Sequence, residues 1–359
     1  MKLVKHIVCL LVLMMAWLPT VGAEANESQS INASEIVLEH IKDTYDWHVT
    51  EIGDRSIVIN LPVIVKSSTG WHVFSTAEFA HEPDAKGYRM GPAQLAIATR
   101  GEHAGKVVEL QGEKEVLPFD ISITKTVAVM FINVVILLLC ILLPARWYRR
   151  HKASDAAPGG FTGLVEMLVM YVEDNIIKPG VGEEGYEKYS PYLMTCFFFI
   201  LVCNIMGVIP FPPGSGNVTG NIAITFFLAV CTFIVTQVSG TKHYWKDIFW
   251  PDVPWWLKAP IPILPVIELF GVFTKPFALM IRLFANIFGG HAVAISLTCV
   301  IFITCQMGLS KGATISPISV LLMIFMDLLE VLVAFIQAFV FTMLSSVFIG
   351  LSHQGGEEH

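Results

Sequence analysis

The stretch from Pro276 to His291 reads PFALMIRLFANIFGGH and lies inside a hydrophobic segment long enough to cross a membrane. Its most informative residue is Arg282, because a guanidinium cannot escape the cost of burial by losing its proton. That cost is at least about 2.5 to 3.5 kcal/mol at the centre of a bilayer, even on lenient scales. A residue this costly normally faces a partner or water, so the stretch predicts a membrane protein with an ion pathway.

The composition of the whole chain supports a membrane protein. Hydrophobic residues make up 54% of the 359 residues and charged residues 15%, and the mean hydropathy is +0.63. Five apolar blocks each reach the roughly 18 to 20 residues that a spanning helix needs. They lie at 126–143, 191–211, 221–238, 261–309 and 316–351. We therefore predict an all-α polytopic membrane region, 122–359, with about five spanning helices.

A leader and a polar domain precede the first block. Lys2 and Lys5 come before a short apolar run that ends in the small residues Val21-Gly22-Ala23, so we interpret 1–23 as a cleaved signal peptide. Residues 24–121 hold sixteen Asp and Glu against eight Lys and Arg, and lack long apolar runs. We expect this acidic segment to form a small extracytoplasmic domain of α+β or β-rich type.

Two kinds of pattern give this acidic domain some detail. Short segments at 56–61 and 95–99 are rich in β-forming residues and bounded by Gly, Pro and Asp, which predicts strands. Two Trp-His pairs, at 47–48 and 71–72, are a weak indication of a binding face. They fit half-buried aromatic residues of a small β-rich core better.

Basic residues predict the orientation in the membrane. A cluster directly after the first block places that side in the cytoplasm and the acidic domain outside, in agreement with the signal peptide. The cluster consists of Arg146, Arg149, Arg150 and Lys152. With five spans, the C-terminus is then cytoplasmic.

Two segments between the blocks are predicted to lie at the membrane surface. Residues 161–178 are interrupted by acidic residues, and Leu164, Met167, Leu168 and Tyr171 repeat at helical spacing, which indicates an amphipathic helix on the inner surface. The segment from Thr241 to Pro265 is rich in Trp and Pro, which is typical of an interfacial loop.

The last two blocks are too long for upright spans. A continuous helix over 261–309 would extend roughly 70 Å, more than twice the hydrocarbon thickness of about 30 Å. We therefore predict a long, tilted helical hairpin with its outer turn near Gly308 to Thr314.

Helical spacing sorts the polar residues of this hairpin into stripes. At about 100° per residue, one stripe of the first helix carries Glu268, Lys275, Arg282 and Asn286. His291 lies about 180° away from Arg282. A stripe of the second helix carries Asp327, Glu330 and Gln337.

Pairing of the two helices about an apex near residue 311 gives these residues hypothetical roles. His291 falls at the depth of Glu330, which suits a proton relay from the outer side. Gln337 falls a little over one turn outward from Arg282, which lies about 13 Å further in than His291. Arg282 has no acid at its own depth, so we expect its carboxylate partner on another subunit. Glu268, about 21 Å beyond Arg282 towards the cytoplasm, is placed to line an exit.

Several kinds of chemistry have no motif in the chain. It has no G-x-x-x-x-G-K-[ST] loop, no H-E-x-x-H pair and no G-x-S-x-G elbow, so we expect neither nucleotide hydrolysis nor intramembrane proteolysis. The seven cysteines lack C-x-x-C spacing and read as small hydrophobic residues. We expect no catalytic site, metal, cofactor or nucleic-acid partner.

Other function classes remain as alternatives. A secondary transporter or stand-alone proton channel would also place ionisable residues inside the membrane. It would be expected to carry an internal acid opposite Arg282 and often a repeated half, and neither is found in the sequence. A surface receptor would rest on the outer domain alone and would leave Arg282 unexplained.

Two segments resemble subunit a of the F-type ATP synthases. Arg282-Leu283-Phe284-Ala285-Asn286 is similar to the R-L-F-x-N motif of that family. Glu330 and Gln337 are similar to its polar residue seven positions before a glutamine. The resemblance runs from about Thr126 to the C-terminus and continues at 204–210 and 219–222. Some members carry an aspartate where Gly207 stands.

This resemblance implies a stator subunit of the F0 sector that couples proton flow to rotation and ATP synthesis in a bacterial plasma membrane. Arg282 would face the carboxylate of each passing c subunit and separate two offset half-channels. Glu268 would line the inner half-channel, and the outer one would be lined by Asn286, His291, Glu330 and Gln337. Supporting positions are Lys275, Asp327, Asn204 and Asn221. The implied partners are the c-ring, subunit b of the peripheral stalk, the F1 sector and the lipid bilayer.

Overall fold

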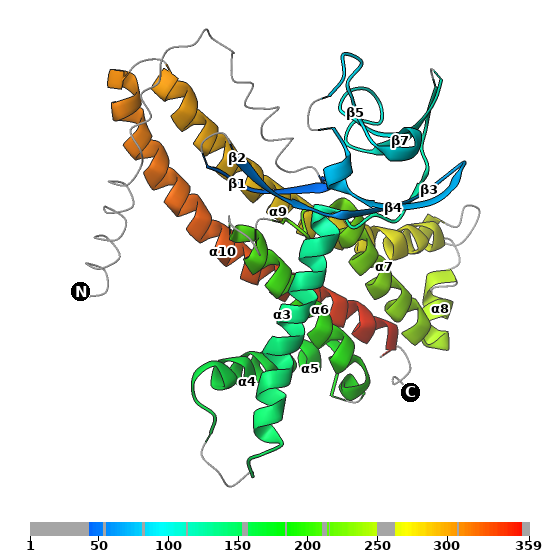
Figure 1. The fold of residues 1–359 in the computed structure, drawn as a ribbon. Coiled ribbons are helices and arrows are strands. Elements are labelled where there is room, and N and C mark those ends of the chain that lie inside the picture. Colours follow the sequence, from blue (N-terminus) through cyan, green and yellow to red (C-terminus); the bar gives the residue numbers. More distant parts are fainter. Residues whose placement is uncertain are drawn as a thin grey trace. The chain divides into compact units, whose positions relative to one another are not determined.

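The computed structural model describes residues 43–52, 55–80, 83–112, 114–152, 157–183, 185–209, 214, 216–249, 263–306 and 309–353. Figure 1 shows the course of the chain. The predicted signal peptide, 1–23, lies outside the described residues, and so do Trp250, Trp255 and Trp256 of the predicted interfacial loop.

The described part of the segment before the first long helix is built of short antiparallel strands. Strands β1 (Asp46–Ile52) and β2 (Arg55–Asn60) form a hairpin. A three-stranded sheet has the order β4 (Gly70–Ser75), β3 (Pro62–Ser67), β9 (Phe119–Asp120). A four-stranded sheet has the order β5 (Tyr88–Met90), β6 (Leu95–Ala98), β7 (Val107–Gln111), β8 (Lys114–Val116). Short 3-10 turns occupy Thr76–Glu78 and Pro92–Gln94. The strands predicted at 56–61 and 95–99 are confirmed as β2 and β6.

The two larger sheets share one apolar core. Alternate residues of β3 point inward and meet inward residues of β6 and β7, because successive side chains of a strand lie on opposite faces. The buried members are Tyr45, Val63, Val65, Phe79, Leu95, Ile97 and Val107. The Tyr45 hydroxyl donates to Asp120, and burial together with that carboxylate raises the pKa of Tyr45.

Glu109 of β7 is a buried acid with its hydrogen bonds satisfied. Its carboxylate accepts from the backbone N–H of Ser68 at 3.0 Å and also from the Ser68 hydroxyl. These bonds favour the ionised form, so they lower the pKa of Glu109 below its usual value. The contact ties the β3–β4 turn to the opposing sheet.

The two Trp-His pairs have different environments. Trp47 is buried in a cluster with Leu61, Val129, Cys203 and Val218, as expected of a core aromatic residue. Trp71 is 57% exposed, so the expectation of a half-buried ring is wrong there. The reason is the alternation of β4, which turns Phe74 to the core and Trp71 to the opposite face.

Five helices of the described chain are long and apolar enough to cross a membrane, which confirms the predicted architecture. They are α3 (Lys125–Tyr148), α6 (Tyr186–Val208), α7 (Ile222–Ser239), α9 (Ile263–Gln306) and α10 (Leu309–His353). In Figure 1, α9 and α10 run side by side as the longest elements of the fold.

A common core joins α6, α9 and α10. Leu279, Leu283 and Ile287 of α9 recur every fourth residue on one face and are buried against the other two helices. Their partners include Ala338 and Phe341 of α10 and Leu193, Phe197 and Ile200 of α6. This packing leaves the opposite face of α9 exposed.

Two boundaries differ from the prediction. The turn expected near Gly308 to Thr314 is wrong over 309–314, since α9 ends at Gln306 and α10 already begins at Leu309, and Gly308 lies outside the described residues. Gly312 is part of α10, because the low helix propensity of one glycine is a weak preference that context overrides. The interfacial loop is also wrong at its start, where α8 (Lys242–Phe249) forms, with His243 Nδ1 lying 2.9 Å from Asp247 Oδ2 one turn later.

The predicted surface helix over 161–178 is interrupted. It consists of α4 (Gly160–Val172), a π-helical turn at Glu173–Ile177 and α5 (Lys178–Val181). Leu164, Met167 and Tyr171 of α4 are exposed, as expected of a lipid-facing side. The later part instead packs on α10. A Cβ on Gly350 would lie 2.1 Å from the carbonyl oxygen of Gly180, so this close approach requires a residue without a side chain.

Candidate ion pathway

His291 and Glu330 meet between α9 and α10. His291 Nδ1 lies 3.3 Å from Glu330 Oε1, and the two side chains are 24% and 7% exposed. Thr298 contacts Met323 seven residues further along α9 and seven residues back along α10, so the helices run antiparallel. The predicted match in depth between His291 and Glu330 is confirmed as a direct contact.

The other polar residues of α10 surround this contact. Gln337 is buried two turns further along α10, and Asp327 is half-buried about one turn before Glu330. Gly290 lies beside the carboxylate, because a Cβ there would be 3.6 Å from Glu330 Oε1, which is ordinary van der Waals contact. The polar stripe of α10 therefore faces the protein interior at Glu330 and Gln337.

Arg282 has a different setting. It is exposed on α9, as are Glu268, Lys275 and Asn286 of the same predicted stripe. Within the described ranges, the Arg282 guanidinium makes neither a hydrogen bond nor an ion pair. The structure thus separates a buried His-acid contact from an arginine on the open face of the same helix.

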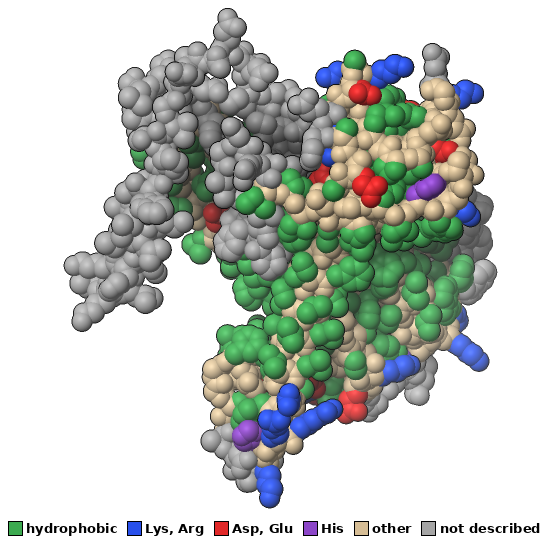
Figure 2. Space-filling view, in the orientation of Figure 1, with side chains coloured by type: hydrophobic (Ala, Val, Ile, Leu, Met, Phe, Trp, Pro, Cys, Tyr) green, Lys and Arg blue, Asp and Glu red, His purple; other side chains and the backbone are tan. Residues whose placement is uncertain are grey.

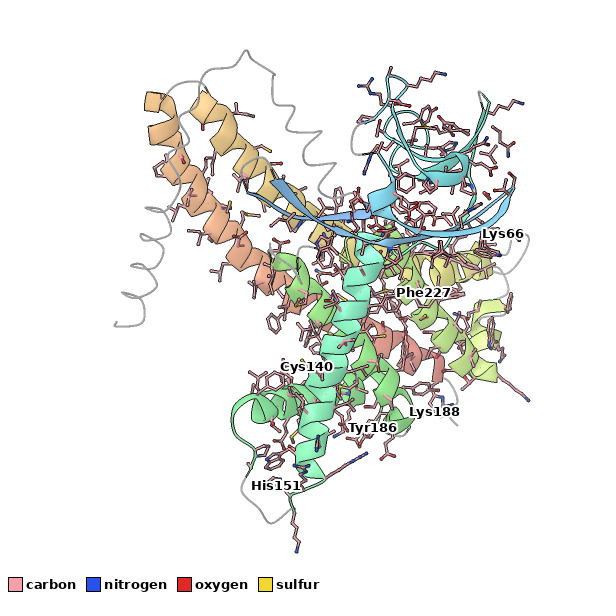
Figure 3. All side chains as sticks on the ribbon, viewed as in Figure 1. Lys66, Cys140, His151, Tyr186, Lys188 and Phe227 are labelled. Carbon is pink, nitrogen blue, oxygen red and sulfur yellow. The ribbon has the colours of Figure 1, made fainter. Side chains whose placement is uncertain are left out.

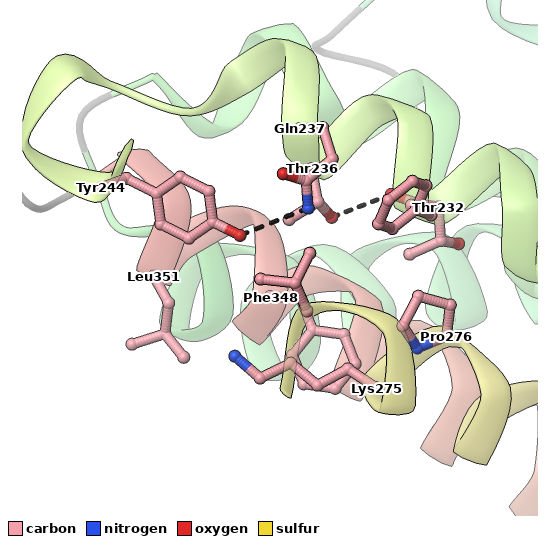
Figure 4. A pocket seen from close by; sticks show the side chains of 10 residues that line it. Thr232, Thr236, Gln237, Tyr244, Lys275, Pro276, Phe348 and Leu351 are labelled. Atoms are coloured by element: carbon pink, nitrogen blue, oxygen red, sulfur yellow. Dashed lines mark hydrogen bonds between the residues drawn. The ribbon is translucent and has the colours of Figure 1, made fainter. Parts of the chain in front are cut away.

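Lys275 contacts a ring of α10. Its Nζ lies 5.7 Å from the centre of the Phe348 ring, a geometry that allows a cation–π interaction. Both residues line a cavity of about 20 Å³ between α7, α8, α9 and α10, enough for roughly one water molecule. In Figure 4, Gln237 of α7 donates to the Tyr244 hydroxyl at 3.3 Å at the edge of this cavity.

Asn204 joins three parts of the membrane region close to Glu330. Its Nδ2 donates to the carbonyl oxygen of Ala334, one turn after Glu330, at 3.2 Å. Its Oδ1 accepts from the Thr219 hydroxyl at 2.6 Å, and both side chains are buried. Asn221 instead caps α7, since its Oδ1 accepts from the backbone N–H of Ala223 at 3.0 Å.

The structure adds buried polar side chains that the sequence reasoning missed. Asn133 of α3 is 1% exposed, lies beside the Cys203 thiol, and makes no hydrogen bond of good geometry with the described residues. The sequence signal that could have identified Asn133 is a single amide side chain within the apolar block 126–143. Asn217 also has a buried amide nitrogen without a described partner. A Cβ on Gly207 would lie 4.0 Å from the Oδ1 atom of the same amide.

Five apolar helices, a buried His-acid contact and an open intramembrane arginine define the chain as an ion-conducting, multi-pass membrane protein. The model of the ATP synthase A chain family matches residues 127–350, more than half of the sequence. The chain therefore belongs to the ATP synthase subunit a family. Residues 36–124 match a second family model, described as a domain of unknown function (DUF8433).

Curated relatives support the assignment. The chain is 42% identical over 250 residues to ATP synthase subunit a of Chloroherpeton thalassium, which covers 68% of this chain and 72% of that protein. It is 38% identical over 246 residues to the Myxococcus xanthus subunit, covering 67% and 76%. With the subunit of Chlorobium phaeobacteroides strain DSM 266 the identity is 40% over 336 residues, covering 85% and 93%.

Family membership confirms the resemblance found in the sequence. The chain is a non-catalytic, proton-conducting stator subunit of the F0 sector, and it works within an ATP synthase complex of F0 and F1 partners. The alternatives of a stand-alone channel, a secondary transporter and a surface receptor are thereby set aside.

Proposed function

We propose that Arg282 separates two offset proton half-channels and faces the carboxylate of each c subunit as the ring turns. The observation that carries this proposal is the open position of Arg282 on α9 without a described acidic partner. An unpaired guanidinium inside a span costs at least about 2.5 to 3.5 kcal/mol, and a carboxylate from a neighbouring subunit offsets that cost.

The charge of Arg282 accounts for two effects. An adjacent guanidinium favours the ionised form of a carboxyl group, so it lowers the pKa of the c-subunit acid and promotes release of its proton. The same fixed charge repels a proton that would pass directly from one half-channel to the other. Arg282 thus couples proton transfer to rotation and prevents a leak.

In the outer half-channel, His291 and Glu330 form the relay. An imidazole and a carboxylate 3.3 Å apart are within reach for proton exchange, directly or through a slight rearrangement. Asn204 supports the backbone of α10 one turn away, and Gln337 and Asn286 continue the polar path towards Arg282.

The inner half-channel involves Glu268. This residue shares the exposed stripe of Arg282 and lies about 21 Å from it along α9, on the side that the basic residues assign to the cytoplasm. We assign Glu268 to the exit of protons towards the cytoplasm, with Lys275 and Asp327 in supporting positions.

The proposal includes the topology and the direct partners. Residues 1–23 act as a signal peptide, 24–121 lie outside the cell, and 122–359 span the bacterial plasma membrane with a cytoplasmic C-terminus. Arg146 and Arg149 at the end of α3 support this orientation. The c-ring contacts the open face of α9, and subunit b of the peripheral stalk holds the stator.

Replacement of Arg282 tests the proposal. Arg282→Ala is expected to reduce ATP-driven proton pumping by inverted membrane vesicles to background, because the c-subunit carboxylate loses its counter-charge. After removal of F1, the same vesicles are expected to leak protons faster than the wild type. Ile281→Ala, at the neighbouring exposed position of α9, is the matched control and is expected to keep normal pumping. Normal pumping by Arg282→Ala refutes the assignment.

A further inference from the structure

The outer face of the three-stranded sheet is apolar and open. We name it the Trp71 face, and it consists of Ile64, Lys66, Trp71, Val73, Phe119 and Ile121. Val73 is 69% exposed, Phe119 63% and Ile121 53%. These residues share one side of the sheet, because Lys66 is paired with both Trp71 and Phe119, and directly paired residues lie on the same face.

Side-chain contacts hold the Trp71 face together. The rings of Trp71 and Phe119 lie 6.5 Å apart in an edge-to-face arrangement, and Lys66 Nζ lies 5.9 Å from the centre of the Trp71 ring. The opposite side of the same sheet is occupied by the core residues Val63 and Val65. Large contiguous apolar patches on a protein surface mark sites of interaction with other proteins or with membranes.

The sheet that carries this face is fixed to the start of the first spanning helix. The chain after β9 continues beside β3, where the N–H of Ile121 donates to Ile64 at 2.9 Å and the N–H of Ile123 donates to Pro62 at 3.1 Å. Helix α3 begins two residues later, at Lys125, whose N–H donates to Thr44 at 2.8 Å. Pro62 therefore lies within about 10 Å of the outer end of α3.

A second group of contacts fixes the position of the strand-rich domain on the spanning helices. Trp47 of β1 and Leu61, directly before β3, are buried against Val129 of α3 and Val218 before α7. In Figure 1, β3 and β4 run across the axis of α3 rather than along it. Figure 2 shows hydrophobic side chains gathered below the strip that these strands occupy.

Charge favours a lipid partner over an acidic surface. The six residues of the Trp71 face include one lysine and no acid, although the segment 24–121 carries sixteen acids. Trp and Phe beside a lysine are typical of the membrane–water interface, where the rings lie among headgroups and the amine reaches lipid phosphate. Figure 3 shows Lys66 on the strands, on the same side of the view as Phe227, an exposed residue of α7.

We propose that the Trp71 face is a membrane-binding surface, seated in the headgroup region of the leaflet next to the start of α3 and favouring anionic phospholipid through Lys66. It gives the strand-rich domain a role beyond the proton pathway. The domain is anchored to lipid and holds the outer end of α3, and with it the packing of α3 on α6, in a fixed orientation.

Photo-crosslinking in the intact complex tests this proposal. p-Benzoylphenylalanine is introduced at Val73 of the full chain, the ATP synthase is reconstituted in vesicles of phosphatidylcholine and phosphatidylglycerol, and irradiated subunits are analysed by mass spectrometry. A phospholipid adduct at position 73 is expected. Met90 is the matched control, since it is exposed and apolar but pairs with Ala96 on the outer face of the four-stranded sheet, where no lipid adduct is expected. Leu139, half-exposed in the middle of α3, is the position that must react with lipid.

The outcomes separate lipid from other occupants. If Leu139 reacts with lipid while Val73 gives an adduct with another subunit, the proposal is overturned in favour of a protein partner. If Leu139 reacts and Val73 reacts no more than Met90, the face is open to water and the proposal is also overturned. Lys66→Gln is expected to lower the yield of lipid adduct at Val73 severalfold with phosphatidylglycerol and to leave it unchanged in pure phosphatidylcholine. An equal yield in both lipids overturns the role of Lys66.

Discussion

The contact between His291 and Glu330 predicts energetic coupling that a double-mutant cycle can measure. The perturbations are His291→Ala, Glu330→Gln and the two combined. Opposite unit charges 3.3 Å apart attract by about 5 kcal/mol at an effective dielectric constant of about 20, which is an upper limit for this pair. Residues in contact usually show coupling of about 0.5 to 3 kcal/mol. We expect a value near 1.4 kcal/mol, which corresponds to about a tenfold change in rate.

The assay is the initial rate of ATP-driven proton uptake by inverted vesicles that contain equal amounts of assembled complex. If the relay needs both partners, removal of the second residue costs less once the first is gone. The double variant is therefore expected to pump about tenfold faster than the product of the two single losses predicts. Exchange of the two residues, His291→Glu with Glu330→His, is expected to pump protons faster than either single variant, though more slowly than the wild type.

A second contact of the same helices serves as the control for packing. Thr298 Oγ1 lies 3.4 Å from Met323 Sδ, and neither side chain carries a charge. Thr298→Val and Met323→Leu are expected to leave pumping near the wild-type rate, alone and together. The relay hypothesis is refuted if the losses at His291 and Glu330 are additive within about 0.3 to 0.5 kcal/mol.

Two further predictions concern stability. Gly350→Ala places a Cβ 2.1 Å from the Gly180 carbonyl oxygen, so α10 must shift, and the free energy of unfolding is expected to fall by about 1 to 3 kcal/mol, seen as a lower thermal midpoint in detergent. The hydrogen bonds from Ser68 lower the pKa of Glu109, so their stabilisation is present above the usual glutamate pKa of about 4.3 and is lost as the pH falls through the lowered value. Glu109→Gln is expected to remove this step from the pH dependence of hydrogen exchange in β7.

Matched variants distinguish these effects from general damage. Gly271→Ala meets no atom within 4 Å, so its thermal midpoint should stay at or above that of the wild type. Equal midpoints for the Gly350 and Gly271 variants contradict the close approach of α5 and α10. Glu102→Gln, in an exposed turn, should leave the pH profile of β7 unchanged, and a profile unaltered by Glu109→Gln contradicts the role of the Ser68 bonds.

The architecture of the membrane region was predictable because length and hydropathy are local properties of the chain. A run of apolar residues must satisfy its backbone within its own helix once it lies in lipid, so five such runs predict five spans. Helix ends were less predictable. The turn expected at Gly308 to Thr314 rested on the composition of a few residues, and α10 begins at Leu309 despite them. The π-helical turn at Glu173–Ile177 had no sequence signal either, since its burial against α10 depends on contacts distant in the chain.

Part of the candidate site followed from the same local periodicity. Depth along a helix grows by a constant rise per residue, so the antiparallel pairing of His291 with Glu330 could be computed from their positions about the hairpin apex. The direction in which each side chain points could not. Lys275 shares a stripe with Arg282 but contacts the Phe348 ring, and both line a cavity between four helices. Asn133 was passed over as one amide among apolar residues, and its burial beside Cys203 depends on how α3 packs on α6.

The sequence by itself determined the number of spans, the presence of a costly intramembrane arginine and the family of the chain, because these depend on residue types and spacings alone. Only the tertiary structure decided which ionisable side chains contact one another and which remain exposed without a described partner. The buried Glu330 side chain contacts His291, whereas Arg282 lies on the exposed face of α9 without a described partner. In the strand-rich domain, Trp47 and Trp71 are each followed by a histidine in the sequence. Trp47 lies in a core, whereas Trp71 lies on an exposed face. Burial depends on which segments pack over a side chain. These segments are distant in the chain, so a local sequence pattern does not determine it.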